Sequence, residues 1–375
     1  MRQLLPLKLK RLNFTQTDPY FHRMSESQSP FGGPLKTAKP LLSSTSRAAF
    51  LLAVVGFLPL PALAQHSLYM SATLSDSEDF TIGKALSSDS GLYVSHDRQS
   101  AQHLGFHHPR LDKGDFDPRD PDILYVGALN GVLGTRDGGQ SWKILTSWNM
   151  TEGKDVKVDP HQPDRLFAAF PDGIAISTDQ GQTWNYSDNG IRRKYTQTLA
   201  PDRHREDHFL AGTELGIFRS TNGGLLWTEV LTTTATVNHI VQSPHDPDRF
   251  LATTQENGAW LSLDAGISWT QIHPHEPESS FHTASFHPHK PGVLTLGGWG
   301  YGLRLSTDLG RTWSQPGGLP HDNVWSHAMD PDYPDRLYAS LYRDTVYVSD
   351  DFGRTWEPFL FPGATIWGYI FVPRN

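Results

Sequence analysis

The sequence predicts an all-β protein, a seven-bladed β-propeller with four-stranded blades. A short turn motif, first complete at residues 135–142 (TRDGGQSW), recurs about every 43 residues, which is the length of a propeller blade. The composition agrees, because 33 Gly, 27 Pro and short alternating apolar runs are typical of chains rich in strands and turns. The central Asp or Asn of the motif stands at Asp137, Asp179, Asn222, Asp264, Asp308 and Asp351.

Each copy of the motif predicts a hairpin turn. An alternating strand such as residues 173–177 runs in, and then an Asp and a Gly reverse the chain. The Asp can accept backbone N–H groups of its own turn, and Gly adopts positive φ without steric cost. A Trp that buries a large apolar ring ends every copy, at Trp142, Trp184, Trp227, Trp269, Trp313 and Trp356. We therefore interpret the motif as structural; the alternative is a calcium or sugar ligand in every blade.

The pattern S-x-D-x-G-x-T-W resembles the Asp-box (BNR) repeat. That repeat is found in sialidases, Asp-box xyloglucanases, sortilin-type receptors and photosystem II assembly factors, and the resemblance covers about residues 90–373. It implies a β-propeller fold. It leaves the function open, because these families include enzymes, receptors and assembly chaperones.

A second signature gives the order of strands within one repeat. A proline-containing segment precedes each turn motif, as at residues 117–125 and 159–167. Proline cannot donate to a strand ladder, so these segments connect strands. Each repeat therefore reads as strand A, proline turn, strand B, loop, strand C, Asp box and strand D.

The two ends of the chain complete each other. Residues 365–373 read as a strand A with nothing after it, and residues 91–97 read as a strand C that leads into a decayed Asp box. Joining these ends makes a seventh blade and removes an open sheet edge. We expect a single propeller domain over residues 65–375.

Residues 1–64 are expected to be an N-terminal extension with a secretory signal segment. The apolar run 48–64 follows Arg47 and ends in a small-x-small pattern, which predicts cleavage after Ala64. The run is short for a membrane span and is broken by prolines, although an uncleaved anchor is the alternative. The true start is either Met1 or Met24. We expect an exported protein, periplasmic or secreted, with no membrane span after cleavage.

Charge and composition restrict the partners. Residues 1–64 hold eight of the 32 Lys and Arg and two of the 40 Asp and Glu, so residues 65–375 carry a net charge of −14. Such an acidic surface disfavours nucleic acids and anionic membranes. There is no Cys and therefore no thiol chemistry. We expect a monomer with a protein or carbohydrate ligand and no cofactor.

Function is expected where the blades differ. Strand A lines the central channel of a propeller, and the loops that lead into it share the face opposite the Asp boxes. The position six residues before the strand A proline is never aliphatic, and we call its seven occupants the channel-mouth residues. They are Asp112, Lys154, Tyr195, Asn238, His282, Trp325 and Trp367. A solvated mouth that tolerates any polar residue is the alternative, but exposed Trp is usually kept for contact.

Two further aromatic residues are candidate ligand contacts. The Gly-rich segment 297–302 holds Trp299 and Tyr301, which we expect to stand out from a loop on the same face. Aromatic rings beside polar side chains suit either a sugar face or a protein epitope. The 18 histidines could converge near the channel, but none has a typical metal-binding spacing, so we predict no metal site.

Glycoside hydrolysis is the alternative function. It needs two carboxylates on one sugar, and Asp112, Glu152 and Asp155 are the candidates on adjacent blades. The resemblance weakens this reading, because the Phe/Tyr-Arg-Ile-Pro segment and arginine triad of sialidases are missing. Xyloglucanase-type enzymes also use two propellers, whereas this chain predicts one. We therefore favour binding over catalysis.

Overall fold

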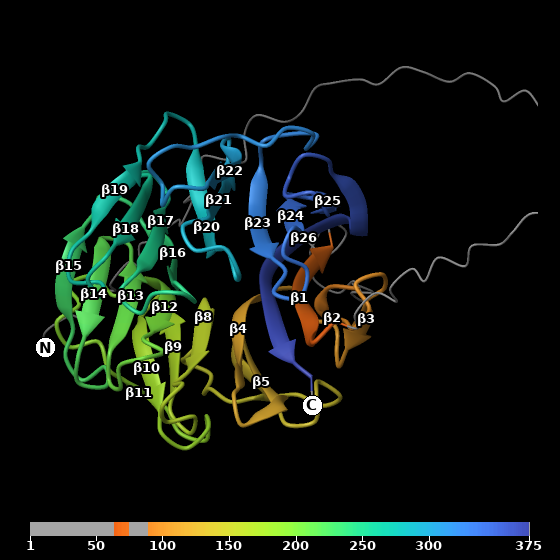
Figure 1. Ribbon diagram of the computed structural model, residues 1–375. Coiled ribbons are helices and arrows are strands. Elements are labelled where there is room, and N and C mark those ends of the chain that lie inside the picture. The colour runs from red at the N-terminus through yellow and green to blue at the C-terminus, as the bar shows by residue number, and fades with distance from the viewer. Residues whose placement is uncertain (1–63, 75–88, 375) are drawn as a thin grey trace, which may run out of the picture. The chain divides into compact units, whose positions relative to one another are not determined.

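The computed structural model describes residues 64–74 and 89–374 (Figure 1). These residues form β-strands and no helix, which confirms the all-β prediction. The apolar run, except for its last residue Ala64, lies outside the described residues, as do Met1 and Met24. The signal segment and its cleavage site therefore stay predictions.

Four of the sheets have four antiparallel strands that follow each other in chain order. The first contains β4 (Leu111–Asp117), β5 (Asp120–Ala128), β6 (Gly131–Thr135) and β7 (Lys143–Ile144). The second contains β8 (Asp155–Val158), β9 (Leu166–Phe170), β10 (Gly173–Ser177) and β11 (Asn185–Tyr186). The third contains β12 (Thr196–Pro201), β13 (Phe209–Thr213), β14 (Gly216–Ser220) and β15 (Thr228–Thr232). The fourth contains β16 (Val237–Gln242), β17 (Phe250–Thr254), β18 (Ala259–Ser262) and β19 (Thr270–His273).

The fifth sheet is reduced to three strands. It contains β20 (Ser280–Phe286), β21 (Leu294–Trp299) and β22 (Gly302–Ser306). A single bridge between Leu305 and Ser314 stands where the other sheets have their fourth strand.

The last sheet has seven strands and joins the two ends of the described chain. Its order is β23 (Val324–Met329), β24 (Leu337–Leu341), β25 (Asp344–Ser349), β26 (Glu357–Pro373), β1 (His66–Leu74), β2 (Gly91–Ser95) and β3 (Gln102–Leu104). The 17-residue strand β26 pairs with β25 through its first half and with β1 through its second half. The sequence analysis did not identify β1, which lies between β26 and the expected strand at residues 91–95.

One strand of each of the five smaller sheets and two strands of the seven-stranded sheet, β23 and β26, contact one another in sequence. Contacts join β4 to β8, β8 to β12, β12 to β16, β16 to β20, β20 to β23, β23 to β26 and β26 to β4. We call these seven the inner strands.

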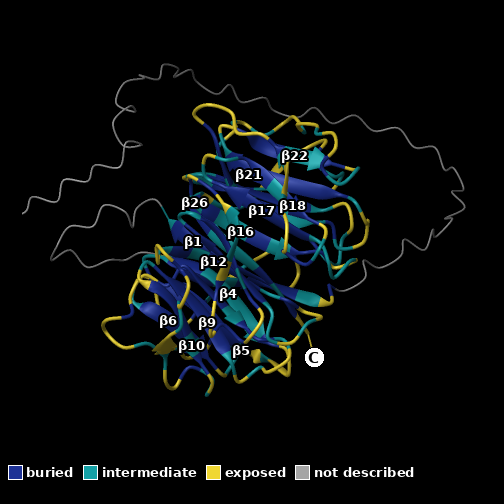
Figure 2. Ribbon diagram, turned by 90° about the vertical axis from the view of Figure 1, so that its left-hand side faces the viewer, coloured by how far each residue is buried: buried dark blue, intermediate teal, exposed yellow. Residues whose placement is uncertain are grey.

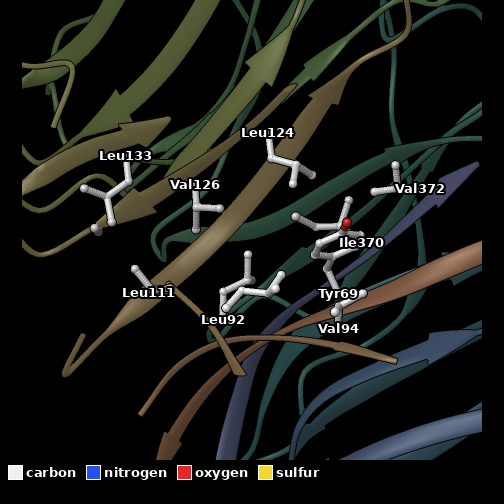
Figure 3. Packing of buried hydrophobic residues seen from close by; sticks show 11 residues of the cluster. Tyr69, Leu92, Val94, Leu111, Leu124, Val126, Leu133, Ile370 and Val372 are labelled. Atoms are coloured by element: carbon white, nitrogen blue, oxygen red, sulfur yellow. The ribbon is translucent and has the colours of Figure 1, made fainter. Parts of the chain in front are cut away.

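Apolar side chains fill the spaces between neighbouring sheets, as expected for strands covered on both faces. Figure 2 shows the strands largely buried and the exposed residues gathered in the connecting loops. In Figure 3, Leu92, Val94 and Ile370 from one sheet pack against Leu124 and Val126 from another. This cluster fixes the strands of the two chain ends against β4, β5 and β6.

Candidate functional site

The Asp boxes are closed hydrogen-bond systems. In the second copy, the Asp179 carboxylate accepts the Thr183 N–H at 2.8 Å and the Thr183 hydroxyl at 2.7 Å, while the buried Ser177 hydroxyl accepts the Gly181 N–H at 2.8 Å. These donors lower the pKa of Asp179 to about 2. The residue after the Asp has positive φ in several copies, for example Gln180 at 59°. A carboxylate saturated by its own turn has little capacity left for a ligand.

Copies that depart from the motif keep part of the same hydrogen-bond pattern. Asn222 Oδ1 accepts the Leu226 N–H and the Ser220 hydroxyl, both at 3.0 Å, but it has no hydroxyl donor at position 226, where Leu replaces the Ser or Thr of the other boxes. In the decayed copy, Asp97 still accepts the N–H groups of Gln99 and Ser100, both at 2.9 Å. The turn therefore survives where the sequence motif has decayed.

The box tryptophans pack between sheets. Trp142 and Trp184 donate their indole N–H groups to the box glycine carbonyls, at 2.9 and 3.1 Å. Trp227 is buried and donates to the Ser187 carbonyl instead. Asp137, Asp264, Asp308 and Asp351, with Trp269, Trp313 and Trp356, occupy the same places in their own turns.

At the other end of the inner strands, three channel-mouth residues meet as aromatic neighbours. The ring centroids of His282 and Trp325 are 4.6 Å apart, and those of Trp325 and Trp367 are 5.0 Å apart with the rings nearly perpendicular. The Arg110 guanidinium lies 4.1 Å from the Trp367 ring centroid, a cation–π contact. Burial lowers the pKa of His282 to about 4, so this ring is neutral at pH 7.

Arg110 connects the aromatic rings to the acidic part of the mouth. Its guanidinium pairs with both oxygens of Asp112, at 3.2 Å each. Burial nevertheless raises the pKa of Asp112, although Arg110 and Lys154 oppose the shift. Next to it, the buried Lys154 pairs at 3.1 Å with Glu152, which is exposed on a loop and has positive φ. Asp112 and Glu152 thus both face cations.

The remaining two channel-mouth residues bond to their own or a neighbouring strand. The Tyr195 hydroxyl donates to Gln197 Oε1 at 2.8 Å, and burial raises its pKa. The Asn238 side-chain amide donates to the Phe281 carbonyl on β20, at 2.7 Å. Both side chains remain partly exposed.

Asp155 is placed differently from the other two candidate carboxylates. It is fully buried, and one oxygen pairs with Lys157 at 2.8 Å. The other oxygen accepts the Leu199 N–H at 3.0 Å and the Thr198 hydroxyl at 3.2 Å, both from β12. Its geometry is that of a bond between β8 and β12, and neither of its oxygens is accessible from the surface.

The Gly-rich segment separates its two aromatic residues. Trp299 is partly exposed and packs 5.5 Å from Tyr342, whose ring is in turn 5.2 Å from Trp325. Tyr301 is fully buried and stacks on Phe281 at 3.9 Å, because glycines on both sides let its ring turn into the core. The expectation that Tyr301 stands out from a loop is therefore corrected.

The sequence analysis named neither Tyr342 nor Arg110 as a residue of the site. Tyr342 lies between β24 and β25, at the turn that corresponds to the one holding Trp299. Aligning these B-to-C turns from one repeat to the next would have found it. Arg110 directly precedes β4, one residue before the registered strand begins.

Within residues 64–74 and 89–374 no group of three or more His, Asp or Glu is placed to hold a metal ion. The same residues contain no helix of the length and apolarity that a membrane crossing requires.

A family model for the BNR/Asp-box repeat matches residues 175–186 and 347–358, which contain the second and sixth boxes. The chain carries BNR/Asp-box repeats. No curated protein sequence matches it. Among solved structures, the GH74 xyloglucanase from Xanthomonas campestris is similar, with a TM-score of 0.58 and 15% identity over 84% of this chain and 55% of the enzyme. An ancestral GH74 enzyme has a TM-score of 0.54 and 17% identity over 70% of this chain and 38% of its own.

The chain thus spans about 40% to 55% of the length of these two enzymes. YCF48 from Cyanidioschyzon merolae is also similar, with a TM-score of 0.53 and 18% identity over 66% of this chain and 84% of YCF48. A structure of YCF48 bound to D1 peptide has a TM-score of 0.52 and 16% identity over 71% of this chain and 93% of its own. At these identities the similarity establishes the propeller fold, and the repeat protein shares it with both enzymes and a peptide-binding protein.

Proposed function

We propose that this repeat protein is an exported, seven-bladed propeller that recognises a protein or glycan ligand at its channel-mouth face. Seven inner strands that each contact the next, with β26 returning to β4, support the blade count. The second half of β26 with β1, β2 and β3 supplies the last blade under this proposal. Similarity to an extracellular domain from B. thetaiotaomicron, with a TM-score of 0.54 and 16% identity over 67% of this chain, supports export.

One observation carries the choice of binding over catalysis. Each candidate carboxylate is already neutralised by a neighbouring cation: Asp112 by Arg110, Glu152 by Lys154, and Asp155 by Lys157. A glycosidase needs one carboxyl group to donate a proton and a second to attack or activate water at the same sugar. A carboxylate that is held in its own ion pair is suited to orienting a charged ligand and is less suited to exchanging a proton with it.

The aromatic half of the mouth suits a binding surface. Trp299, Trp325 and Trp367 are partly exposed, and their neighbours fix the orientation of the rings. Pre-oriented aromatic rings beside charged groups lose little conformational entropy when a ligand binds. Trp148 adds a side chain that is 92% exposed on the loop between β7 and β8. Such a surface accepts the apolar face of a sugar or an aromatic or Arg anchor of a protein.

The binding proposal is tested with a glycan array and a peptide library probed with the purified protein. Trp325→Ala combined with Trp367→Ala should weaken the strongest ligand found by at least about tenfold, since truncating central aromatic anchors costs about 2 kcal/mol or more. Tyr186→Ala, on the outer strand β11, is the matched control and should bind normally. Circular dichroism checks that the double variant is folded. Unchanged affinity in the folded double variant would rule out the channel mouth as the binding site.

Hydrolysis is the second candidate, because one observation favours it. Asp112 is buried with a raised pKa, as a general acid requires, and lies close to Glu152 through Lys154. Incubation with a panel of polysaccharides, followed by a reducing-sugar assay, tests this function. Sugar release that falls at least about a hundredfold in Asp112→Asn would establish a glycosidase and overturn the binding proposal.

A further inference from the structure

A cavity of about 460 Å³ lies among the inner strands. Its wall includes residues of β4, β8, β16, β20, β23 and β26. It extends to the proline turns that follow these strands, at Pro244, Pro288 and Pro331. The cavity therefore reaches the end of the inner strands that is opposite the channel-mouth residues, although Trp367 lines both.

The lining of the cavity is cationic. Lys113, Lys157 and Arg203 line it together with the histidines His66, His239 and His327, of which His66 contacts the Asp332 carboxylate at 2.8 Å. Among the described residues that form the wall, there is no Asp or Glu. This is a positive site in a chain whose residues 65–375 carry a net charge of −14. Low-dielectric walls of one sign of charge concentrate counter-ions.

Two of these cations are bonded to neutral oxygens. Lys113 Nζ donates to the Asn238 carbonyl at 2.6 Å. Arg203 donates to the backbone carbonyls of Gln242 and Ser243, at 2.9 and 3.1 Å. In the described parts of the chain neither forms an ion pair with a carboxylate, whereas Lys157 pairs with Asp155. Asp155 and Asp112 only partly offset the cost of burying the Lys113 ammonium group, because burial still lowers the pKa of Lys113 to about 8, and an anion in the cavity would offset that cost further.

A neutral donor stands beside these cations. His239 Nδ1 accepts the Ala284 N–H at 3.2 Å, so the neutral ring carries its proton on Nε2. Burial lowers the pKa of His239 well below its usual range, with Lys113 and Lys157 adding to the effect, so the ring remains neutral at pH 7. His327 differs, because hydroxyls of Thr283 and Thr295 engage both of its nitrogens. His239 can therefore donate to a ligand, whereas His327 is held by the wall.

We propose that this cavity binds a small tetrahedral oxyanion, phosphate or sulfate, through Lys113, Lys157 and Arg203, with His239 Nε2–H as a further donor. Lys113 and Arg203, which form no ion pair in the described residues, match the charge of such an anion, Lys157 adds a cation that is shared with Asp155, and N–H donors match the oxygens of the anion. Arg203, which is exposed, forms the entrance from the proline turns. The site does not depend on what binds at the channel mouth.

The test is a thermal unfolding titration of the full chain at pH 7, with sodium phosphate or sodium sulfate against sodium chloride at equal ionic strength. A ligand that binds only the folded state raises Tm in a saturable way. Lys113→Met should weaken the response at least tenfold. Because Lys113 forms no ion pair in the described residues, its removal leaves no ion-pair partner behind. Lys143→Met, an exposed lysine on β7, is the matched control and should respond as the natural protein does.

A second variant and a third anion complete the design. Arg203→Gln should also weaken the rise in Tm that the anion causes. This variant provides the test if Lys113→Met does not fold. A response to phosphate alone or to sulfate alone identifies the source of the oxyanion. No saturable response to either anion would overturn the proposal, as would an unchanged response in Lys113→Met and Arg203→Gln. A rise in Tm with citrate alone would overturn the proposal that the ligand is a tetrahedral oxyanion. Trp325→Ala should retain the response, which separates this site from the one at the channel mouth.

Discussion

The Asp-box turns and the channel mouth differ in where the hydrogen-bond partners of their polar groups lie. In an Asp box, one carboxylate is satisfied within its own eight residues, as Asp179 is by Thr183. At the mouth, Asp112 and Lys154 pair with charged neighbours two residues away, whereas Asn238 depends on the Phe281 carbonyl of another strand. A self-contained turn can be repeated without regard to its neighbours, whereas a residue that depends on the next blade is free to differ from blade to blade. The difference teaches that repetition in this chain marks local stability and variation marks contact.

The decayed box breaks this rule, and it gives the largest expected effect. Arg98 follows Asp97 with a φ of 59°, and its buried guanidinium pairs with Asp330 at 2.7 Å. Arg98→Ala should lower the free energy of unfolding by about 3–5 kcal/mol, because it leaves the fully buried Asp330 unpaired. Gln180→Ala, at the equivalent position of a complete box, is the control and should cost far less. Urea unfolding of both variants measures the difference, and equal costs would contradict it.

A complete box should show a smaller, purely local effect. Ser177→Ala removes the buried hydroxyl that accepts the Gly181 N–H at 2.8 Å. The unsatisfied N–H should lower the free energy of unfolding by about 1–3 kcal/mol. Ligand binding at the mouth should stay unchanged in this variant, as measured by titration at a temperature well below Tm. A loss of affinity there would show that the two regions are coupled.

The dependence of stability on pH should differ in sign between the two regions. The pKa of Asp179 is lowered to about 2 by its turn, so its contribution is present above the unfolded pKa and is lost as pH falls from about 4 to about 2. Burial raises the pKa of Asp112, so the folded state binds its proton more tightly than the unfolded state does. Its contribution is therefore greatest at low pH and falls as pH rises above about 4.

Asn substitutions reveal these signs. As pH rises from 2 to 7, Asp179→Asn should become progressively less stable relative to the natural protein. Asp112→Asn should change in the opposite direction. Tm values measured across this pH range test both expectations. If the Tm difference from the natural protein changed with pH in the same direction for both variants, the expected difference between a turn carboxylate and a buried one would be wrong.

The sequence predicted the all-β class because its periodic features are local. Box turns, proline connections and alternating strands each depend on residues a few positions apart, so a single repeat is enough to recognise them. The strand β1 was missed because it lacks the proline and box signatures and pairs with β26 from the far end of the chain. Local patterns hold no information about such a partner.

The candidate site was harder to predict for the same reason. Register along the inner strands placed His282, Trp325 and Trp367 in one group of positions, and their ring contacts join strands of two different sheets. Burial could not be read from the residue types. Asp155 is charged and Tyr301 is aromatic, and both were expected at the channel-mouth face. Both side chains nevertheless lie in the interior. The cationic cavity escaped notice because its wall is assembled from six inner strands.

The pairing of β1 with β26 sets the order in which the molecule can be completed. Ser67 and Arg374 are hydrogen-bonded across a sequence separation of 307 residues, so β1 leaves the ribosome long before its partner exists. Until β26 arrives, one edge of β1 has no strand to pair with and is open to pairing with other chains. Contacts of such long sequence separation form late and slowly. Synthesis of the last 17-residue strand is therefore the step that ends the risk of misassembly.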